Sequence, residues 1–313
     1  MKSTRFFKIA LASLFVGGFL GGKAQAALFL DAFDSGASSS NFLVTQIAGS
    51  TDTFTFGHDY SVNLIPEAPR SIGAFNAQRG LFLAANNSLA LPPIGANNGI
   101  NVTPSIGGIA INFGQDIRMS FDMWLNISTV TAASTELALF GINTDGLLVN
   151  SRTGATQANA DGVWYHVSAE GGFGNTSTNP NSRDYVNYIG NAVPGRLDNA
   201  DSIPTGVFPT SLPVPGIPGN SWVQVDIEEI GGNVRMSMNG ITVFDVANTG
   251  PTVGSVFLGY QDPFSGSFSG PSGFVVFDNL SVTAVPEPST FALLVPVAAG
   301  AWVVRRRRLA KVA

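Results

Sequence analysis

The sequence predicts an all-β fold, a two-sheet antiparallel β-sandwich. First, 36 glycines and 18 prolines among 313 residues interrupt helices throughout the chain. Second, several segments place an apolar side chain at every second position, which is the period of a strand with one buried face. Third, 44% of the residues are apolar and only 12% are charged, so the chain can bury a sizeable core. A helical pattern is found only at the two ends.

Residues 1–26 are predicted to be a secretory signal peptide. Three basic residues at the start are followed by an apolar run over residues 9–20 and by a small-x-small cleavage site. The residues of this site are Ala24, Ala26 and Ala27. A permanent membrane anchor is the alternative, but the apolar run is short for spanning. We therefore expect signal peptidase to release a body that occupies residues 27–285.

Two segments of the body, residues 118–127 and 222–246, carry the clearest strand pattern. The first segment alternates polar side chains with an apolar row. That row is Met119, Phe121, Met123, Leu125 and Ile127. The second segment holds three alternating runs, joined by turns at residues 231–233 and 239–240. The second turn is Asn-Gly, a strong hairpin signal, so we predict a meander of three antiparallel strands.

Nine shorter segments complete the predicted sandwich. They are residues 28–33, 53–56, 81–84, 109–113, 137–142, 163–169, 184–189, 255–260 and 274–282. Six prolines in residues 191–221 exclude a central strand there, and we expect a long surface loop, with a linker between domains as the alternative. No internal repeat of fixed period favours a propeller or a solenoid.

The last 29 residues form a three-part tail: a short motif, a charge-free run over residues 291–304 and a basic stop. The motif is Val285, Pro286, Glu287 and Pro288, and the stop is Arg305, Arg306, Arg307 and Arg308. This arrangement resembles the PEP-CTERM sorting signal, by which exosortase recognises exported proteins of Gram-negative bacteria. A buried core helix is the alternative, but it would not need four arginines behind it.

The physical properties of the tail agree with that resemblance. The four arginines would remain on the cytoplasmic side while the exported body lies across the membrane. The run of 14 residues spans only roughly 21 Å as a helix, short of a hydrocarbon core of roughly 30 Å, so flanking residues must contribute. The resemblance implies a transient transmembrane helix in residues 286–313, cleavage near the motif by an exosortase-like enzyme, and delivery to the cell surface or extracellular matrix.

The body resembles a concanavalin A-like (laminin G-like) jelly-roll. The resemblance rests on the opening strand at residues 29–34, the hairpin within residues 222–240 and the closing strand at residues 277–282. It implies that the first and last strands pair. Because folds of this kind host lectins, glycosidases and adhesion domains alike, the resemblance does not decide the function.

Carbohydrate binding is suggested by aromatic side chains that could present flat faces to sugar rings. The candidates are Trp124, Trp164, Tyr165, Tyr185, Tyr188 and Tyr260. Trp124 is the best of them because it lies on the strand face opposite the apolar row of residues 118–127. The alternative is that these rings belong to the core, where most aromatic residues of a sandwich lie.

A structural calcium ion is a second hypothesis, since calcium takes oxygen ligands and the body is acidic. Asp31, Asp34 and Asp278 would converge if the first and last strands pair as the jelly-roll resemblance implies. The alternative is that these residues are ordinary surface aspartates near strand ends. No other cofactor is expected.

Glycoside hydrolysis is the competing function. Laminarinase-like glycosidases of the jelly-roll kind carry Glu-x-Asp-x-Glu on one strand, and here the corresponding residues are Gln224, Asp226 and Glu228. The amide of Gln224 stands where the nucleophilic carboxylate would be and cannot form a glycosyl ester. We therefore predict no catalytic residue, and interpret these side chains as the solvated face of a strand.

Composition excludes several other functions. The body carries seven arginines, no lysine and 20 acidic residues, a formal net charge of −13, which repels nucleic acid. The absence of cysteine excludes disulfides and thiol chemistry. The only histidines, His58 and His166, have no second histidine at metal-binding spacing, and no phosphate-binding loop is present. We expect an exported, non-enzymatic protein that is structural or binds extracellular polysaccharide, with adhesion to proteins as a further alternative.

Overall fold

The computed structural model describes residues 27–71, 78–85, 98–114, 116–127, 136–151, 160–168, 184–210, 215–263 and 273–285. The predicted signal peptide and the sorting tail beyond Val285 lie outside these residues. The cleavage-site residues Ala24 and Ala26, the Pro-Glu-Pro motif and the four arginines therefore remain sequence-based predictions.

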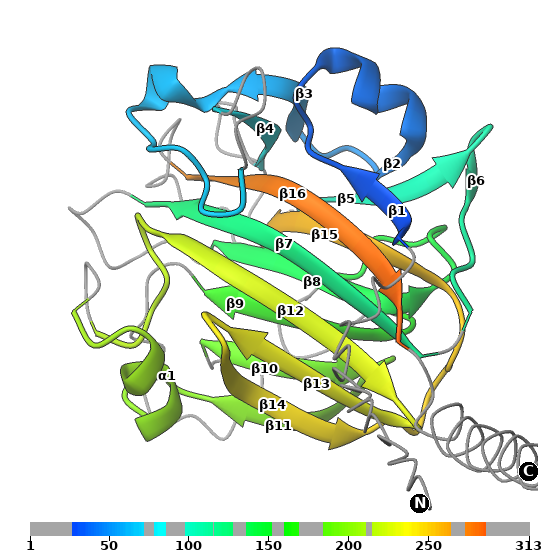
Figure 1. Ribbon diagram of the computed structural model, residues 1–313, viewed down its shortest axis with the longest axis vertical. Helices are drawn as coiled ribbons and strands as arrows, with labels where there is room; N and C mark the ends of the chain where they lie inside the picture. Colours follow the sequence, from blue (N-terminus) through cyan, green and yellow to red (C-terminus); the bar gives the residue numbers. More distant parts are fainter. Residues whose placement is uncertain are drawn as a thin grey trace, which may run out of the picture.

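Two antiparallel sheets stack on each other (Figure 1). The first sheet has the order β14-β13-β12-β7-β16-β4-β3, with β1 also paired to β16. Its strands are β1 (Ala27–Asp31), β3 (Thr53–Asp59), β4 (Arg79–Ala84), β7 (Ile117–Asn126), β12 (Trp222–Ile230), β13 (Asn233–Met238), β14 (Ile241–Ala247) and β16 (Phe274–Ala284). The predicted pairing of the opening and closing strands is confirmed.

The second sheet has the order β11-β10-β9-β8-β15-β5-β2, with β6 paired to β5. Its strands are β2 (Phe42–Gln46), β5 (Asn98–Ile106), β6 (Ile109–Ala110), β8 (Leu137–Thr144), β9 (Val163–Ser168), β10 (Tyr185–Ile189), β11 (Ala192–Leu197) and β15 (Ser255–Asp262). The predicted two-sheet antiparallel sandwich is therefore confirmed.

The alternating pattern places one face of the first sheet in the core. Met119, Phe121, Met123 and Leu125 of β7 are fully buried, while the residues between them face outward. The predicted meander of β12, β13 and β14 is also confirmed. Its second turn has Asn239 and Gly240 at φ values of 50° and 79°, as an Asn-Gly hairpin turn requires.

The central strands of the second sheet are buried on both faces. All eight residues of β8 and β15 and all six of β9 are buried. One face contributes to the core between the sheets, and the other holds a separate cluster of Leu137, Leu139, Trp164, Val186, Tyr188 and Phe257. The sequences of these strands are mostly apolar and do not alternate between apolar and polar residues, because neither face is exposed to solvent.

Several element predictions need correction. The strands β2, β5 and β11 were not predicted, and of residues 109–113 only Ile109–Ala110 forms a strand. Part of the predicted loop at residues 191–221 is β11. Because β11 lies at the edge of its sheet, Pro194, which has no backbone N–H, is tolerated there. The body was expected to have no helix, yet α1 (Ser202–Val207) is a short helix, and η1 (Gly36–Asn41) and η2 (Tyr60–Asn63) are 3₁₀ turns.

Within the described ranges, no helix is long and apolar enough to cross a membrane.

Candidate functional site

The outer face of the first sheet carries a row of half-buried polar and aromatic side chains. On β12 these are Trp222, Gln224, Asp226 and Glu228, as the two-residue period predicts. Across the ladder, Trp222 lies opposite Trp124 of β7. The interpretation of the β12 row as the strand face opposite the core is confirmed, but its side chains are half-buried instead of fully solvated.

Two arginines neutralise the carboxylates of this row. Arg118 approaches Asp226 at 3.1 Å and Glu228 at 3.2 Å, and Arg70 approaches Asp226 at 3.0 Å. Ser120 also donates a 2.6 Å hydrogen bond to Asp226. The two carboxylates of the suspected glycosidase pattern are thus engaged in ion pairs instead of standing free beside a substrate.

Beside this row lie two buried aspartates, Asp122 of β7 and Asp278 of β16, which we call the acid pair. They are direct cross-strand partners and are 0% and 2% exposed. Burial, together with the nearby Asp122 carboxylate, raises the pKa of Asp278 to about 8, although hydrogen bonds from Tyr60 and Asn279 act in the opposite direction. Burial also raises the pKa of Asp122. The pair therefore retains a proton near neutral pH.

A segment comprising η2 and residues 64–71, the crossing segment, lies over the acid pair. The Tyr60 hydroxyl donates to Asp278 at 3.0 Å, and the Arg70 backbone N–H donates to Asp122 at 3.0 Å. The Arg70 guanidinium also donates to the carbonyl of Phe121 at 2.8 Å. These bonds engage Asp278 Oδ2 and Asp122 Oδ2, while Asp122 Oδ1 lies 3.6 Å from the Arg70 guanidinium. The sequence placed Asp122 on the polar face of its strand but gave no signal for its partner, which is set by the strand register.

An aromatic cluster flanks the acid pair on the same outer face. Trp124 and Trp222 meet edge to face, with ring centroids 5.8 Å apart, and Tyr60 meets Trp222 at 5.4 Å. Trp222 donates its indole N–H to the carbonyl of Pro66 at 2.7 Å, while Trp124 lies 3.4 Å from the Asn126 side-chain oxygen. Both tryptophans are half-buried. Trp124 is thus a sequence-predicted aromatic candidate that retains solvent exposure.

The other aromatic candidates are buried, and their prediction as exposed platforms is wrong. Trp164, Tyr165, Tyr185, Tyr188 and Tyr260 are at most 1% exposed. Trp164 stacks on Tyr188 at 3.9 Å, Tyr188 contacts His166 Nδ1 at 3.0 Å, and Tyr185 donates to the carbonyl of Gly216 at 2.6 Å. Tyr165, Tyr185 and Tyr260 lie in the core between the sheets. Trp164 and Tyr188 lie on the other face of the second sheet, and that face is also buried along the central strands, which alternation on one strand does not reveal.

The three predicted calcium ligands do not form a metal site. Asp31 accepts hydrogen bonds from the Phe33 N–H and the Ser38 hydroxyl, so its carboxylate fixes the start of η1. Asp278 is committed to the acid pair, and burial followed by the charge of Asp31 raises the pKa of Asp34. Across the described part of the chain, no group of three or more acidic, histidine or cysteine side chains is arranged to hold a metal ion.

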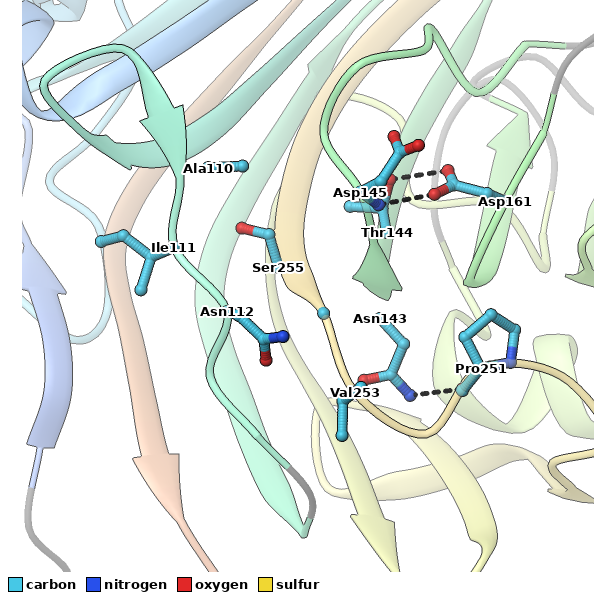
Figure 2. A pocket seen from close by; sticks show the side chains of 11 residues that line it. Ala110, Ile111, Asn112, Asn143, Thr144, Asp145, Asp161, Pro251, Val253 and Ser255 are labelled. Atoms are coloured by element: carbon cyan, nitrogen blue, oxygen red, sulfur yellow. Dashed lines mark hydrogen bonds between the residues drawn. The ribbon is translucent and has the colours of Figure 1, made fainter.

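A pocket of about 290 Å³ lies where β8 ends and β15 begins (Figure 2). We call it the end pocket. Its polar wall is supplied by Asn112, Asn143, Thr144, Asp145, Asp161 and Ser255. The sequence analysis did not single out these residues, because the bulge and loops that bring them together join distant segments.

Fold and outer face together define the class of protein: an all-β, two-sheet antiparallel sandwich with a tryptophan-bearing polar face. No protein-family model matches the chain, and no curated protein matches its sequence. Among solved structures it is similar to a Bacillus subtilis protein of unknown function with a galectin-like fold, with 11% identity, a TM-score of 0.48, and coverage of 84% of this chain and 97% of that one.

Two further solved structures are similar to the chain. One is the carbohydrate-binding module CBM66 from Bacillus subtilis, with 11% identity, a TM-score of 0.34, and coverage of 60% of this chain and 86% of that one. The other is the exoplasmic/lumenal domain of VIP36 in its Ca²⁺-bound form, with 10% identity, a TM-score of 0.43, and coverage of 82% and 89%. The assignment to the sandwich class rests on the strand pairings of the chain itself.

Proposed function

We propose that this is an exported, non-enzymatic protein of the cell surface or extracellular matrix that binds carbohydrate on the outer face of its first sheet. The observation that carries the proposal is the half-buried pair of Trp124 and Trp222 on a polar sheet face. An aromatic ring offers an apolar surface for the C–H face of a sugar, and neighbouring polar groups can bind its hydroxyls.

The surroundings of the tryptophans suit a neutral or weakly polar glycan. Gln224 follows Trp222 on the same face and offers an amide with both donor and acceptor groups. The nearby carboxylates are compensated by Arg70 and Arg118, so the face does not present a single strong charge. Trp124 is the preferred stacking ring, since the indole N–H of Trp222 is already hydrogen-bonded to the Pro66 carbonyl of the crossing segment.

Export and sorting are the second part of the proposal. The signal peptide would direct the chain out of the cytoplasm, and an exosortase-like enzyme would process the tail at the motif that begins with Val285. The body would stay transiently at the inner membrane of a Gram-negative bacterium before delivery. The support is the sequence pattern at the two ends, together with the acidic, lysine-free body.

The competing function, a jelly-roll glycosidase, finds some support in the acid pair, because a protonated Asp278 beside Asp122 has the composition of a general acid and its partner. However, the crossing segment closes over the pair, and Asp226 and Glu228 are held in ion pairs. Carbohydrate binding without hydrolysis therefore remains the better supported function.

The test is co-sedimentation of the full chain with the extracellular polysaccharide of the producing cells. We expect saturable binding, and we expect Trp124→Ala to weaken it about fivefold, which corresponds to ~1 kcal/mol of lost stacking. The matched control is Phe54→Ala, which removes a 41% exposed aromatic ring on edge strand β3. Parallel samples with calcium and with a chelator separate metal-dependent binding from the metal-independent binding expected here.

Three results would count against the proposal. Absence of binding by the parent chain would leave a purely structural or protein-adhesion role. Equal losses for Trp124→Ala and Phe54→Ala would remove the outer face as the site. Unfolding of the Trp124→Ala variant, seen as a collapse of its melting temperature, would mean that this ring is needed for packing and not for stacking on sugar.

A further inference from the structure

The end pocket has a preformed wall, centred on Asn143. This residue is the extra residue of a bulge in β8, since Ile142 pairs with Val256 and Thr144 with Ser255. Its φ of 61° is left-handed, a conformation that asparagine tolerates. The loop before β15 packs tightly on it, because a Cβ added at Gly254 would lie 2.5 Å from the Asn143 carbonyl carbon.

The orientation of the Asn143 side-chain amide is fixed by its partners. Its nitrogen donates to the Glu229 carboxylate at 2.7 Å and to the Pro251 carbonyl at 2.9 Å. Turning the amide over would set its oxygen against two acceptors, so the observed assignment is the only compatible one. Figure 2 shows the nitrogen directed to Pro251 and the oxygen on the opposite side, toward Val253.

The oxygen of this amide has no hydrogen-bond partner within the described structure. Asn143 is 2% exposed, and its Oδ1 is a buried acceptor without a donor. An orphaned buried acceptor costs about 1–3 kcal/mol, so such a group requires an explanation. Because Asn143 lines the end pocket, a donor on a ligand or solvent molecule in the pocket is the available partner.

The rest of the polar wall also favours a donor-rich, positively charged ligand. The Thr144 hydroxyl donates to Asp161 at 2.7 Å, and the Ser255 hydroxyl points to the Val256 carbonyl at 3.4 Å, so both hydroxyls are already directed elsewhere. The Asn112 amide, whose oxygen accepts the Gly114 N–H at 3.0 Å, is the remaining side-chain donor among the described lining residues. Asp145 is exposed and adds a carboxylate beside Asp161. None of the described residues that line the pocket is basic.

No basic side chain among the described residues that line the end pocket compensates its two carboxylates. Burial, and then the nearby Asp145 carboxylate, raise the pKa of Asp161 against its hydrogen bonds from Thr144 and the Asp145 N–H. Two neighbouring carboxylates attract a positive group.

The size of the pocket argues against a single metal ion. A volume of about 290 Å³ corresponds to roughly ten water molecules, far more than one ion and its ligands need. The described residues also bring no third carboxylate or histidine to the wall. The volume suits a molecule of about monosaccharide size, with Pro251 and Val253 covering its apolar parts.

From this geometry we propose that the end pocket binds a small organic ligand that bears a primary ammonium group and hydroxyls, such as a sugar with a free amine. The ammonium would lie near Asp145 and Asp161, and a hydroxyl or N–H would donate to Asn143 Oδ1. The pocket is lined by none of the residues proposed for glycan binding on the outer face, so the two sites are independent.

The test is isothermal titration of the full chain with glucosamine at about pH 6, where the amine is protonated. Glucose and N-acetylglucosamine are the neutral comparison sugars, and calcium chloride is a separate arm. We expect glucosamine to bind at least tenfold more tightly than either neutral sugar. Asp145→Asn should weaken glucosamine at least fivefold, because it removes charge while keeping the side-chain oxygen that accepts the Leu147 N–H.

Two further variants locate the binding. Asp201→Asn makes the same charge change at an exposed position before α1 and should leave glucosamine affinity unchanged. Val253→Lys places a tethered ammonium at the pocket rim, where Val253 is 43% exposed, and should abolish binding without disturbing the core. Melting temperatures of all three variants verify that they fold.

The outcomes decide the proposal. Equal affinity for the three sugars would overturn the argument from charge. Heat from calcium alone would show a cation site in place of an ammonium site, and no heat from any probe would mean that solvent satisfies Asn143. Since polysaccharide binding is measured separately with Trp124→Ala, failure of this proposal leaves the proposed function standing.

Discussion

At the scale of single residues, the acid pair is the least ordinary feature of the molecule. Like charges placed directly opposite each other in a ladder are unfavourable, and burial of both carboxyl groups adds to the cost. Asp122 and Asp278 coexist because one proton is retained and because Tyr60, Asn279 and the backbone of Arg70 donate to them. A site of this kind makes stability depend on pH.

The first prediction concerns Asp278→Asn. The pKa of Asp278 rises from 3.8 to about 8 on folding, so between these values the folded chain holds a proton that the unfolded chain has lost. Its contribution to stability is therefore complete below about pH 4 and declines up to about pH 8, by a few kcal/mol at ~1.4 kcal/mol per pH unit. The amide mimics the protonated acid without titrating, so we expect the variant to lose this decline.

The measurement is denaturant unfolding of the parent and the variant from pH 4 to pH 9. The difference in unfolding free energy should favour the variant increasingly toward pH 9. A difference that stays constant across the range would show that Asp278 does not carry the raised pKa. Asp245→Asn, which changes an exposed carboxylate paired with Arg235, is the control for the loss of one negative charge.

At the scale of elements, the crossing segment depends on a few polar contacts with the first sheet. Its carboxyl-terminal part is fastened by Arg70, whose guanidinium donates to Phe121 and Asp226. A second contact is the hydrogen bond that the Trp222 indole N–H donates to the Pro66 carbonyl of the crossing segment. The crossing segment covers the acid pair and holds one tryptophan of the proposed glycan face, so its attachment affects both.

Removal of Arg70 tests this attachment. Arg70→Ala leaves the buried Asp122 without its cation and Asp226 with Arg118 as its remaining cation, and we expect a loss of about 2–4 kcal/mol of stability. Arg235→Ala breaks an ion pair whose side chains are 52% and 48% exposed, and should cost less than about 1 kcal/mol. Urea unfolding of both variants makes the comparison, and equal costs would contradict the structural role of Arg70.

The hairpin turns give a second prediction at this scale. Gly240 has a φ of 79°, which side chains disfavour, so Gly240→Ala should destabilise the chain by about 1–2 kcal/mol. Gly206 in α1 has open space at its Cβ position and a right-handed backbone, so Gly206→Ala should be neutral or stabilise by up to about 1 kcal/mol. Thermal unfolding compares them, and a stabilising Gly240→Ala would refute the assigned turn.

At the scale of the whole molecule, the two sheets are unequal. The first sheet has one face in the core and one face partly open, whereas β8, β9 and β15 of the second sheet are buried on both faces. A candidate glycan face is therefore available on the first sheet, while the central strands of the second supply packing. Asn143, bonded to Glu229, links β8 of the second sheet to β12 of the first.

The sequence by itself determined what depends on local order along the chain. The two-residue period of β7 and β12 defined their buried and outer faces, and put Trp124 on the outer one, because successive strand side chains point to opposite sides. The Asn-Gly turn defined a hairpin, because few residues accept a left-handed backbone. β5 was missed, because its asparagine, glycine and proline are typical of loops and only its place between β15 and β2 makes it a strand.

Tertiary structure alone decided which side chains meet and which are covered. The pairing of Asp122 with Asp278 follows from the register of β7 and β16, two strands far apart in the chain. Trp164 and Tyr188 are buried because the second face of their sheet is also covered, and the periodicity of a strand sequence does not reveal such cover. The unpartnered oxygen of Asn143 depends on Glu229 and Pro251 taking its nitrogen. Each of these depends on contacts between distant segments, and such contacts are set by packing of the whole chain.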